Sequence, residues 1–320
     1  SIMYSNTAAF KNKPVAAAPP AAQGLLDQVG VDAIAALGFY KLNSAYTGDC
    51  IEVRRSSDSA TQDIGFTGAG VLDTAALATF CGTDTGHIKT WYDQSGNGFD
   101  FNVTNFPSQG GSDANQPIIY YNSAVTTDAA GNIAAYSTTP GSTAATGTLF
   151  LNSPTMTARQ RPNITIFGQV NVNNGNGILH TELGNGYNMG TYGQSGNKLS
   201  VIRSNGTNLL VKQTVNTDAT DPFASTVWYN DDGTGKWWLT SELNNATFEN
   251  TGTVAGFNVA NYSNATIFRY YSNSLYQNCA LSGYVYWDIA DNSTLSTQEV
   301  YDLYDWVETN LGYTNNAPTP

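Results

Sequence analysis

Short apolar segments separated by Asn, Gly and Asp turns fill the second half of the chain. Their alternating or continuous apolar pattern, over four to nine residues, is typical of β-strands. It predicts strands at 164–172, 177–183, 198–203, 209–215, 226–229, 236–243, 266–271 and 281–287. Earlier strands are expected at 50–55 and 116–121. Many short strands with few helices predict an all-β protein built as a β-sandwich.

Three short stretches carry helix signals. Residues 24–42 predict one or two helical turns, and Asp73 is placed to cap a short helix that runs through Phe80. The best marked helix lies near the end, where Ser296 and Glu299 form a capping box. Its apolar face comprises Val300, Leu303, Tyr304, Val307 and Leu311, and Gly312 can end it.

The two ends of the chain differ from the middle. Residues 1–23 contain an Ala/Pro run that blocks regular structure and predicts an extended N-terminal arm, which packs on a neighbour or stays mobile. Residues 24–313 are expected to form one sandwich domain, and 314–320 a disordered tail.

Composition narrows the function classes. Charged residues make up 12% of the chain, against about 25% in an average protein. The polar surface is therefore built from Asn, Thr, Ser, Gln and Gly, as in virion and extracellular β proteins. A net charge of -12 with 13 basic residues argues against a nucleic-acid partner. The chain contains no apolar run of about 18 residues, the length that a membrane-spanning helix requires. No signal peptide is visible either.

The metal and redox signals are weak. Cys50, Cys81 and Cys279 are odd in number and show no C-x-x-C spacing, so neither a disulfide framework nor a zinc site is indicated, although one pair could bridge. His87 and His180 are too few for a three-histidine metal site.

The run Thr-Trp-Tyr-Asp-Gln-Ser-Gly-Asn-Gly at 90–98 is the most particular segment, together with 44–48 and 51–58. These segments resemble the catalytic domain of glycoside hydrolase family 54 α-L-arabinofuranosidases. They are also similar to lectin-like jelly-roll modules of phage virion and bacterial surface proteins. The resemblance implies a concanavalin A-like or laminin-G-like jelly roll with a short C-terminal helix.

Within that motif we interpret five residues as structural: Tyr92, Asp93, Gln94, Ser95 and Gly96. Asp and Ser beside a Gly-Asn-Gly bend can bind their own backbone amides. A buried Asp93 pairing with Arg54 or Arg55 is a further hypothesis.

The resemblance also implies a catalytic pair, because a retaining glycosidase needs two carboxyl groups about 5 to 5.5 Å apart. It places the first, weakly, at Glu182. No Asp or Glu occurs between Glu249 and Asp288, where the second should lie. The family's vicinal cysteines beside this first carboxyl are missing near Glu182, and of its two cysteines in the loop just before the Tyr-Asp-Gln-Ser-Gly motif only Cys81 remains. We therefore expect the catalytic pattern to be degraded.

Aromatic residues offer a glycan-binding surface. Candidates are Trp237, Trp238 and Tyr229, flanked by Asp231 and Asp232. Side chains of adjacent strand residues point to opposite faces, so only one of the two tryptophans faces the core. Asp231 and Asp232 are also weak candidates for a Ca²⁺ site, the alternative being a plain hairpin loop.

Together these observations predict a non-enzymatic structural or adhesion protein of a virion (a fibre, tail or capsid-decorating protein) or of a cell surface, with a glycan as partner. Its N-terminal arm would contact another copy or a neighbouring virion subunit, and its location would be the virion or the extracellular surface. One alternative is an α-L-arabinofuranosidase-like glycoside hydrolase. The other is a purely architectural subunit.

Overall fold

The computed structural model describes residues 23–105, 111–142, 148–160, 162–170, 177–184, 187–194, 198–204, 209–213, 222–229, 235–241, 246–250, 261–269, 278–291, 293–313, 317 and 320. Between 171 and 260, side chains are described only at 222–226. The predicted N-terminal arm and most of the C-terminal tail lie outside these residues and stay predictions.

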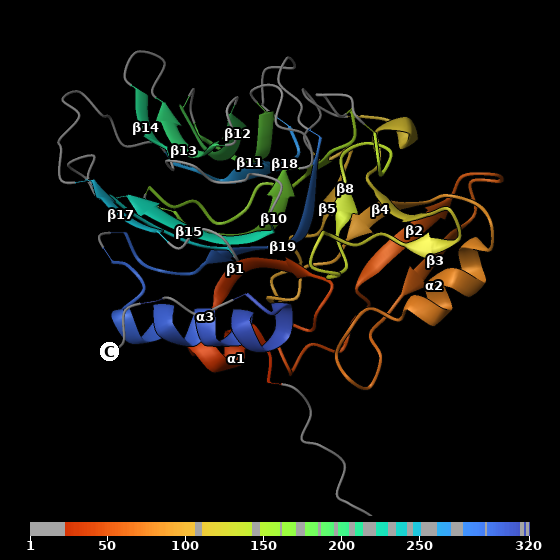
Figure 1. Ribbon diagram of the computed structural model, residues 1–320, viewed down its shortest axis with the longest axis horizontal. Helices are drawn as coiled ribbons and strands as arrows, with labels where there is room; N and C mark the ends of the chain where they lie inside the picture. Colours follow the sequence, from red (N-terminus) through yellow and green to blue (C-terminus); the bar gives the residue numbers. More distant parts are fainter. Residues whose placement is uncertain are drawn as a thin grey trace, which may run out of the picture.

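Antiparallel strands form two stacked layers (Figure 1). The first layer has the order β17-β16-β15-β10-β19-β1. Its strands are β17 (Ala246–Asn250), β16 (Gly235–Ser241), β15 (Phe223–Tyr229), β10 (Asn163–Val170), β19 (Cys279–Trp287) and β1 (Ala33–Gly38).

The second layer has the order β14-β13-β12-β11-β18-β9-β5-β4-β2-β3. Its strands are β14 (Leu209–Gln213), β13 (Lys198–Ser204), β12 (Tyr187–Gln194), β11 (Gly177–Gly184), β18 (Asn264–Ile267), β9 (Leu151–Asn152), β5 (Phe101–Asn102), β4 (Gly86–Trp91), β2 (Ile51–Arg55) and β3 (Thr61–Ile64). The remaining strands are β6 (Ile118–Tyr121), β7 (Ala124–Val125) and β8 (Ala135–Tyr136). Because β6 pairs with β4 and β8, and β8 pairs with β19, the layers are joined.

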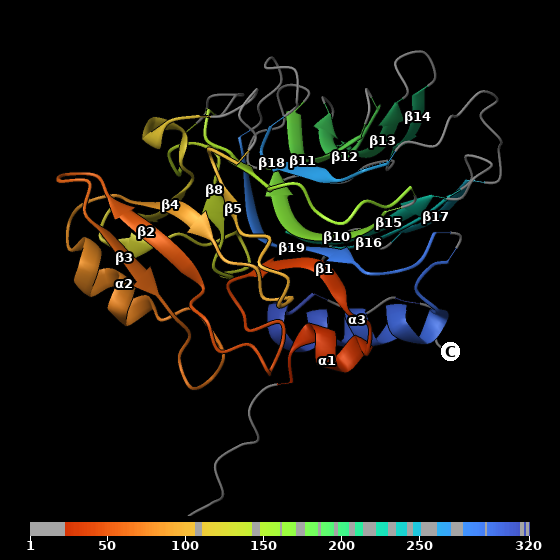
Figure 2. The same cartoon turned by 180° about the vertical axis from the view of Figure 1, so that it is seen from behind.

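In the described part of the chain, three α-helices cover the outside, together with the short 3-10 helix η2 (Asp113–Asn115). Helices α1 (Leu25–Val29) and α3 (Thr297–Leu311) pack side by side under the first layer, and α2 (Thr74–Cys81) lies beside β3 (Figures 1 and 2). The sequence analysis predicted the fold class, an all-β jelly-roll sandwich with a short C-terminal helix, and the structure confirms this prediction. Among the described residues, no helix is both long and apolar enough to cross a membrane.

Strand β19 lies at the centre of the core, and all nine of its residues are buried. Tyr284 and Tyr286 pack in the cluster between the two layers, whereas Val285 and Trp287 pack against the helices. Since successive side chains of a strand point to opposite faces, covering both faces explains why this strand reads as a continuous apolar run.

Helix α3 begins and ends where the sequence predicts. The Ser296 hydroxyl accepts the Glu299 N–H at 3.2 Å, and the Glu299 carboxylate accepts the Ser296 N–H at 2.6 Å. Gly312 has a φ of 76°, a left-handed conformation that glycine adopts without steric cost. The whole predicted apolar face is buried against the first layer.

Two boundaries differ from expectation. The stretch 24–42, predicted as helical turns, contains only the five-residue α1 and then β1, a strand buried at every position. Because both faces of β1 are covered, its sequence lacks the alternation that marks a strand. The strand expected at 266–271 ends at Ile267, since Phe268 takes a left-handed φ of 68° and the Arg269 carbonyl turns back to accept the Thr266 hydroxyl.

Candidate functional site

The motif at 92–96 forms a closed, buried turn. Asp93 is 3% exposed. One oxygen of its carboxylate accepts the N–H groups of Ala36 (2.8 Å) and Ser95 (2.9 Å). The other accepts the Ser95 hydroxyl (2.6 Å) and the Phe99 N–H (3.0 Å). With four donors on two oxygens, this carboxylate holds β1 against the turn and has no lone pair directed to a substrate.

Gln94 extends this anchor to the segment after β1. Its side-chain oxygen accepts the Leu42 N–H at 2.7 Å, and its amide nitrogen donates to the carbonyls of Gly38 (2.8 Å) and Tyr40 (3.1 Å). Gln94 is completely buried. Buried backbone groups need such partners, so the motif fixes the path of residues 38–42.

The hypothesis that Asp93 pairs with Arg54 or Arg55 is wrong. The Arg54 Nε donates to Gln116 at 2.7 Å and its Nη2 to the Asp113 carbonyl at 2.9 Å. Arg55 pairs instead with Asp58, at 2.6 Å. Because the Asp93 carboxylate already accepts four hydrogen bonds, three N–H groups and one hydroxyl stabilise it without a cation.

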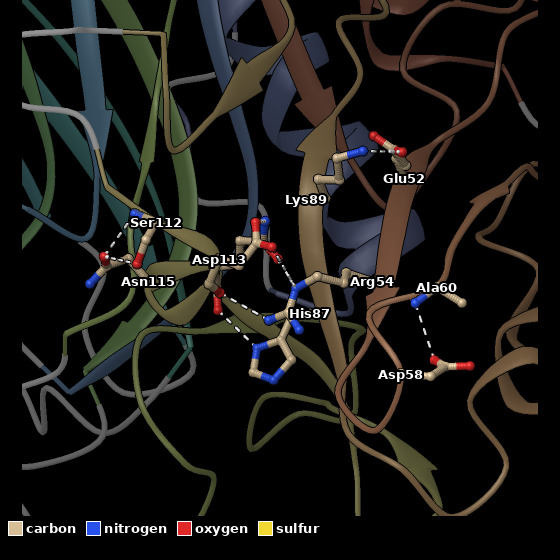
Figure 3. A network of polar contacts seen from close by, with 10 residues as sticks. Glu52, Arg54, Asp58, Ala60, His87, Lys89, Ser112, Asp113 and Asn115 are labelled. Atoms are coloured by element: carbon tan, nitrogen blue, oxygen red, sulfur yellow. Dashed lines mark hydrogen bonds and ion pairs between the residues drawn. The ribbon is translucent and has the colours of Figure 1, made fainter.

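Charged side chains gather on the face of β2 and β4 (Figure 3). The Lys89 Nζ and the Glu52 Oε1 form an ion pair at 2.7 Å. Burial raises the pKa of the Glu52 carboxyl, but the hydrogen bond and charge of Lys89 outweigh it, and the pKa is lowered overall. Burial lowers the pKa of His87, whose Nδ1 donates to the Gln116 carbonyl at 3.0 Å. Each acid here already has a cationic partner, an arrangement suited to stability and not to proton transfer.

Glu182, the catalytic candidate, lies in the middle of β11. Its backbone is paired with Met189 of β12 on one side and with Ala265 of β18 on the other. It therefore occupies an interior strand of the second layer, and strands of this kind are suited to hold catalytic groups in place.

The aromatic candidates lie in the first layer. Tyr229 ends β15 opposite Gly235, and Trp237 and Trp238 of β16 pair with Val227 and Thr226. The structure therefore does not bring these residues onto strands neighbouring Glu182. Asp231 and Asp232, in the predicted turn between β15 and β16, lie outside the described residues. Within the part that is described, no group of three or more His, Cys, Asp or Glu could hold a metal ion.

The sequence analysis missed a pocket of about 370 Å³ between residues 41–49 and 65–70. Its only sequence signals are the closely spaced glycines at 65, 68 and 70 and the aromatic residues Tyr46 and Phe66.

Comparison with known proteins gives one family over most of the chain. A family model described as the catalytic domain of alpha-L-arabinofuranosidase B matches residues 28–316. A probable alpha-L-arabinofuranosidase B of Aspergillus flavus is 47% identical over 58 residues, 18% of this chain and 12% of that protein. An arabinofuranosidase/β-xylosidase of Trichoderma koningii is 47% identical over 57 residues, 18% of this chain and 11% of that protein. The matched regions thus span about a tenth of these relatives.

Solved structures support the same fold. A glutamate-to-glutamine mutant of a GH54 α-L-arabinofuranosidase, soaked with 4-nitrophenyl α-L-arabinofuranoside, superposes with a TM-score of 0.66. The match has 15% identity and covers 92% of this chain and 67% of that one. An arabinofuranosidase complexed with arabinofuranosyl-α-1,2-xylobiose gives a TM-score of 0.64 at 15% identity, covering 91% and 65%.

These matches overturn the main functional prediction, a non-enzymatic virion or surface protein. The family model is that of an enzyme domain and spans both layers and α3. The prediction failed because sparse charge and abundant Asn and Thr describe a β-sandwich surface in general, and do not separate a virion subunit from a glycosidase. The enzymatic alternative is favoured instead.

Proposed function

Because the chain belongs to the alpha-L-arabinofuranosidase B catalytic family, we propose that it is a glycoside hydrolase acting on α-L-arabinofuranosides. The single observation that carries this proposal is the family match over residues 28–316. The two-layer fold supports it, since the GH54 structures share it over more than nine tenths of this chain.

The proposed substrate class is arabinose-substituted oligosaccharide or polysaccharide. The support is the ligand of one similar structure, in which arabinofuranose is linked to xylobiose. Such glycans are extracellular, so we propose that the protein works outside the cell.

Glu182 is the proposed nucleophile. The backbone at Glu182 is paired with a neighbouring strand on each side, and a retaining glycosidase needs its nucleophile held close to the anomeric carbon. No carboxyl that could donate the proton lies within residues 250–287, since that segment contains no Asp or Glu. Among the described carboxyls, Asp93 is saturated by hydrogen bonds and is unsuited to this role.

Release of 4-nitrophenol from 4-nitrophenyl α-L-arabinofuranoside tests the function. The wild-type chain should release it, and Glu182→Gln should lower kcat by at least about 10³-fold, because the covalent step needs a carboxylate nucleophile. Glu308→Gln, at an exposed position on α3, is the matched control and should retain full activity. Absence of release by a folded wild-type protein would refute the proposal.

Trp237, Trp238 and Tyr229 are proposed to contact the glycan, with Asp231 and Asp232 beside them. The support is that an aromatic ring with a polar end can stack on the apolar face of a sugar and also form a hydrogen bond. Trp237→Ala and Trp238→Ala, made separately, should raise KM more than they lower kcat if the residue binds glycan. Ca²⁺ binding at Asp231 and Asp232 stays a prediction, which calcium titration after chelation tests.

A further inference from the structure

We propose that the pocket between residues 41–49 and 65–70 is a second carbohydrate-binding site, separate from the strand that bears Glu182. Its volume of about 370 Å³ lies in the range of small-ligand sites. All its lining residues come from the loops after β1 and β3, whereas Glu182 lies on β11 in the second layer. The choice of pentose probes below rests on the proposed function, but the pocket itself does not.

The loops that form the pocket are fixed by hydrogen bonds. Lys41 N–H donates to the Gly70 carbonyl at 2.7 Å, and Thr67 N–H donates to the Val71 carbonyl at 2.7 Å. Ser44 is tied to Asp27 through both its N–H (2.8 Å) and its hydroxyl (2.9 Å). Such a pocket is formed before a ligand arrives, which lowers the entropy cost of binding.

Two aromatic rings make the apolar part of the wall. Tyr46 and Phe66 meet edge to face, with centroids 6.4 Å apart. The Tyr46 hydroxyl donates to the Asp49 carbonyl at 2.8 Å, so the ring has a fixed orientation. Gly48 lies against the hydroxyl end of the ring, because a Cβ at that position would come within 2.4 Å of the Tyr46 oxygen. An aromatic ring held in a fixed orientation can stack on the C–H-bearing face of a sugar.

The polar part of the wall combines a donor and an acceptor. Lys41 supplies an ammonium group that makes no ion pair with any described residue, and Asp49 supplies a carboxylate. Ser44, Thr47 and Thr67 add hydroxyls. A sugar hydroxyl both donates and accepts, so it can use both kinds of group at once.

Charge argues against an anionic ligand. Burial is the first cause that raises the pKa of the Tyr46 hydroxyl, and the nearby carboxylates of Asp100, Asp49 and Asp93 raise it further, so negative charge lies close to the pocket wall. An anion such as phosphate would be repelled by these carboxylates. A neutral polyol does not meet this penalty, so the pocket fits a neutral sugar better than an anion.

Calorimetric titration with xylotetraose and, separately, L-arabinose tests the site, since neither probe contains an arabinofuranosidic bond to cleave. Wild-type protein should bind at least one probe. Tyr46→Ala and Asp49→Ala should each weaken that binding about tenfold or more. Gly48→Ala should do the same by displacing the Tyr46 ring, whereas Glu308→Gln, at an exposed position on α3 outside the pocket, is the control and should leave binding unchanged. Thermal unfolding confirms that each variant is folded.

Glu182→Gln separates this inference from the proposed function. Binding that survives Glu182→Gln and falls in Tyr46→Ala supports a second site, even if the wild-type protein releases no nitrophenol. Binding lost in Glu182→Gln and unchanged in Tyr46→Ala, or no binding of either probe to the folded wild type, would overturn it.

Discussion

The carboxylate of Asp93 accepts the backbone N–H of Ala36 at 2.8 Å, although 57 residues separate them in the sequence. This bond joins the turn after β4 to the middle of β1, a strand of the other layer. The motif that marks the family resemblance is therefore a clamp between the layers. Gln94 continues the clamp to Leu42, at the entrance of the loop that lines the pocket at 41–70.

Replacing Asp93 by Asn should destabilise the protein by about 1 to 3 kcal/mol, because an amide NH2 would face backbone and hydroxyl donors that now have an acceptor. Urea unfolding at neutral pH measures the free energy. Asp32→Asn is the control, since Asp32 is exposed and should lose under about 0.5 kcal/mol. Identical midpoints for Asp93→Asn and the wild type would contradict the clamp.

A second buried carboxylate, Asp128, should make stability depend on pH. It accepts the Ala130 and Asn132 N–H groups, both at 2.9 Å, and the Tyr313 hydroxyl at 3.0 Å. Burial raises the pKa of Asp128 above the ordinary 3.8 in spite of these bonds. The folded state thus binds the proton more tightly than the unfolded chain does.

The sign follows from that direction. Asp128 contributes stability that is fully present below pH 3.8, and this stability is lost as the pH rises through the folded-state pKa. Asp128→Asn keeps an acceptor for the two N–H groups and removes the titration. Urea midpoints between pH 4 and 7 should therefore show a smaller decline with rising pH in Asp128→Asn than in the wild type. Parallel curves for the two proteins would count against a raised pKa.

The cysteines should be unreactive thiols in the folded protein. Cys50, Cys81 and Cys279 are in the thiol form and at most 1% exposed. Burial raises the pKa of Cys81 to about 11 and that of Cys279 to about 12, so thiolate is scarce at neutral pH. Ellman's reagent should detect almost no thiol before denaturation and three per chain afterwards. Only one thiol after denaturation would reveal a disulfide.

Local sequence signals were sufficient to predict an element whose capping hydrogen bonds are made within the element itself. The capping box and apolar face of α3 placed both of its ends, because Ser296, Glu299 and Gly312 bond within the helix. Strand β1 escaped prediction because burial on both faces removed the alternation at 33–38. The hydrogen-bond partners of Asp93 were not predicted for another reason. Ala36 is distant in sequence, and no local signal shows that Asp93 binds the Ala36 N–H and not the guanidinium of Arg54.

The candidate site was predicted only in part. Glu182 fell within a predicted strand and lies on β11. The pocket at 41–70 was not found, because it depends on Lys41 and Gly70 being joined across two loops that follow different strands. Hydrogen bonds between loops of this kind depend on how the layers pack, and no periodic pattern in the sequence predicts them.

The missing acid at 250–287 makes a prediction about leaving groups. Nitrophenolate departs from an arabinofuranoside without protonation, whereas the xylobiose alkoxide of arabinofuranosyl-α-1,2-xylobiose needs a general acid, whose help is worth about 10²- to 10⁴-fold. With Glu182 as nucleophile and no donor in that segment, kcat/KM for the nitrophenyl substrate should exceed that for the oligosaccharide by a ratio in this range. Steady-state kinetics on both substrates, with Glu308→Gln as the control, measure the ratio. Equal values would show that a carboxyl from another segment donates the proton, and acidic residues outside 250–287 would then be replaced one at a time to find it.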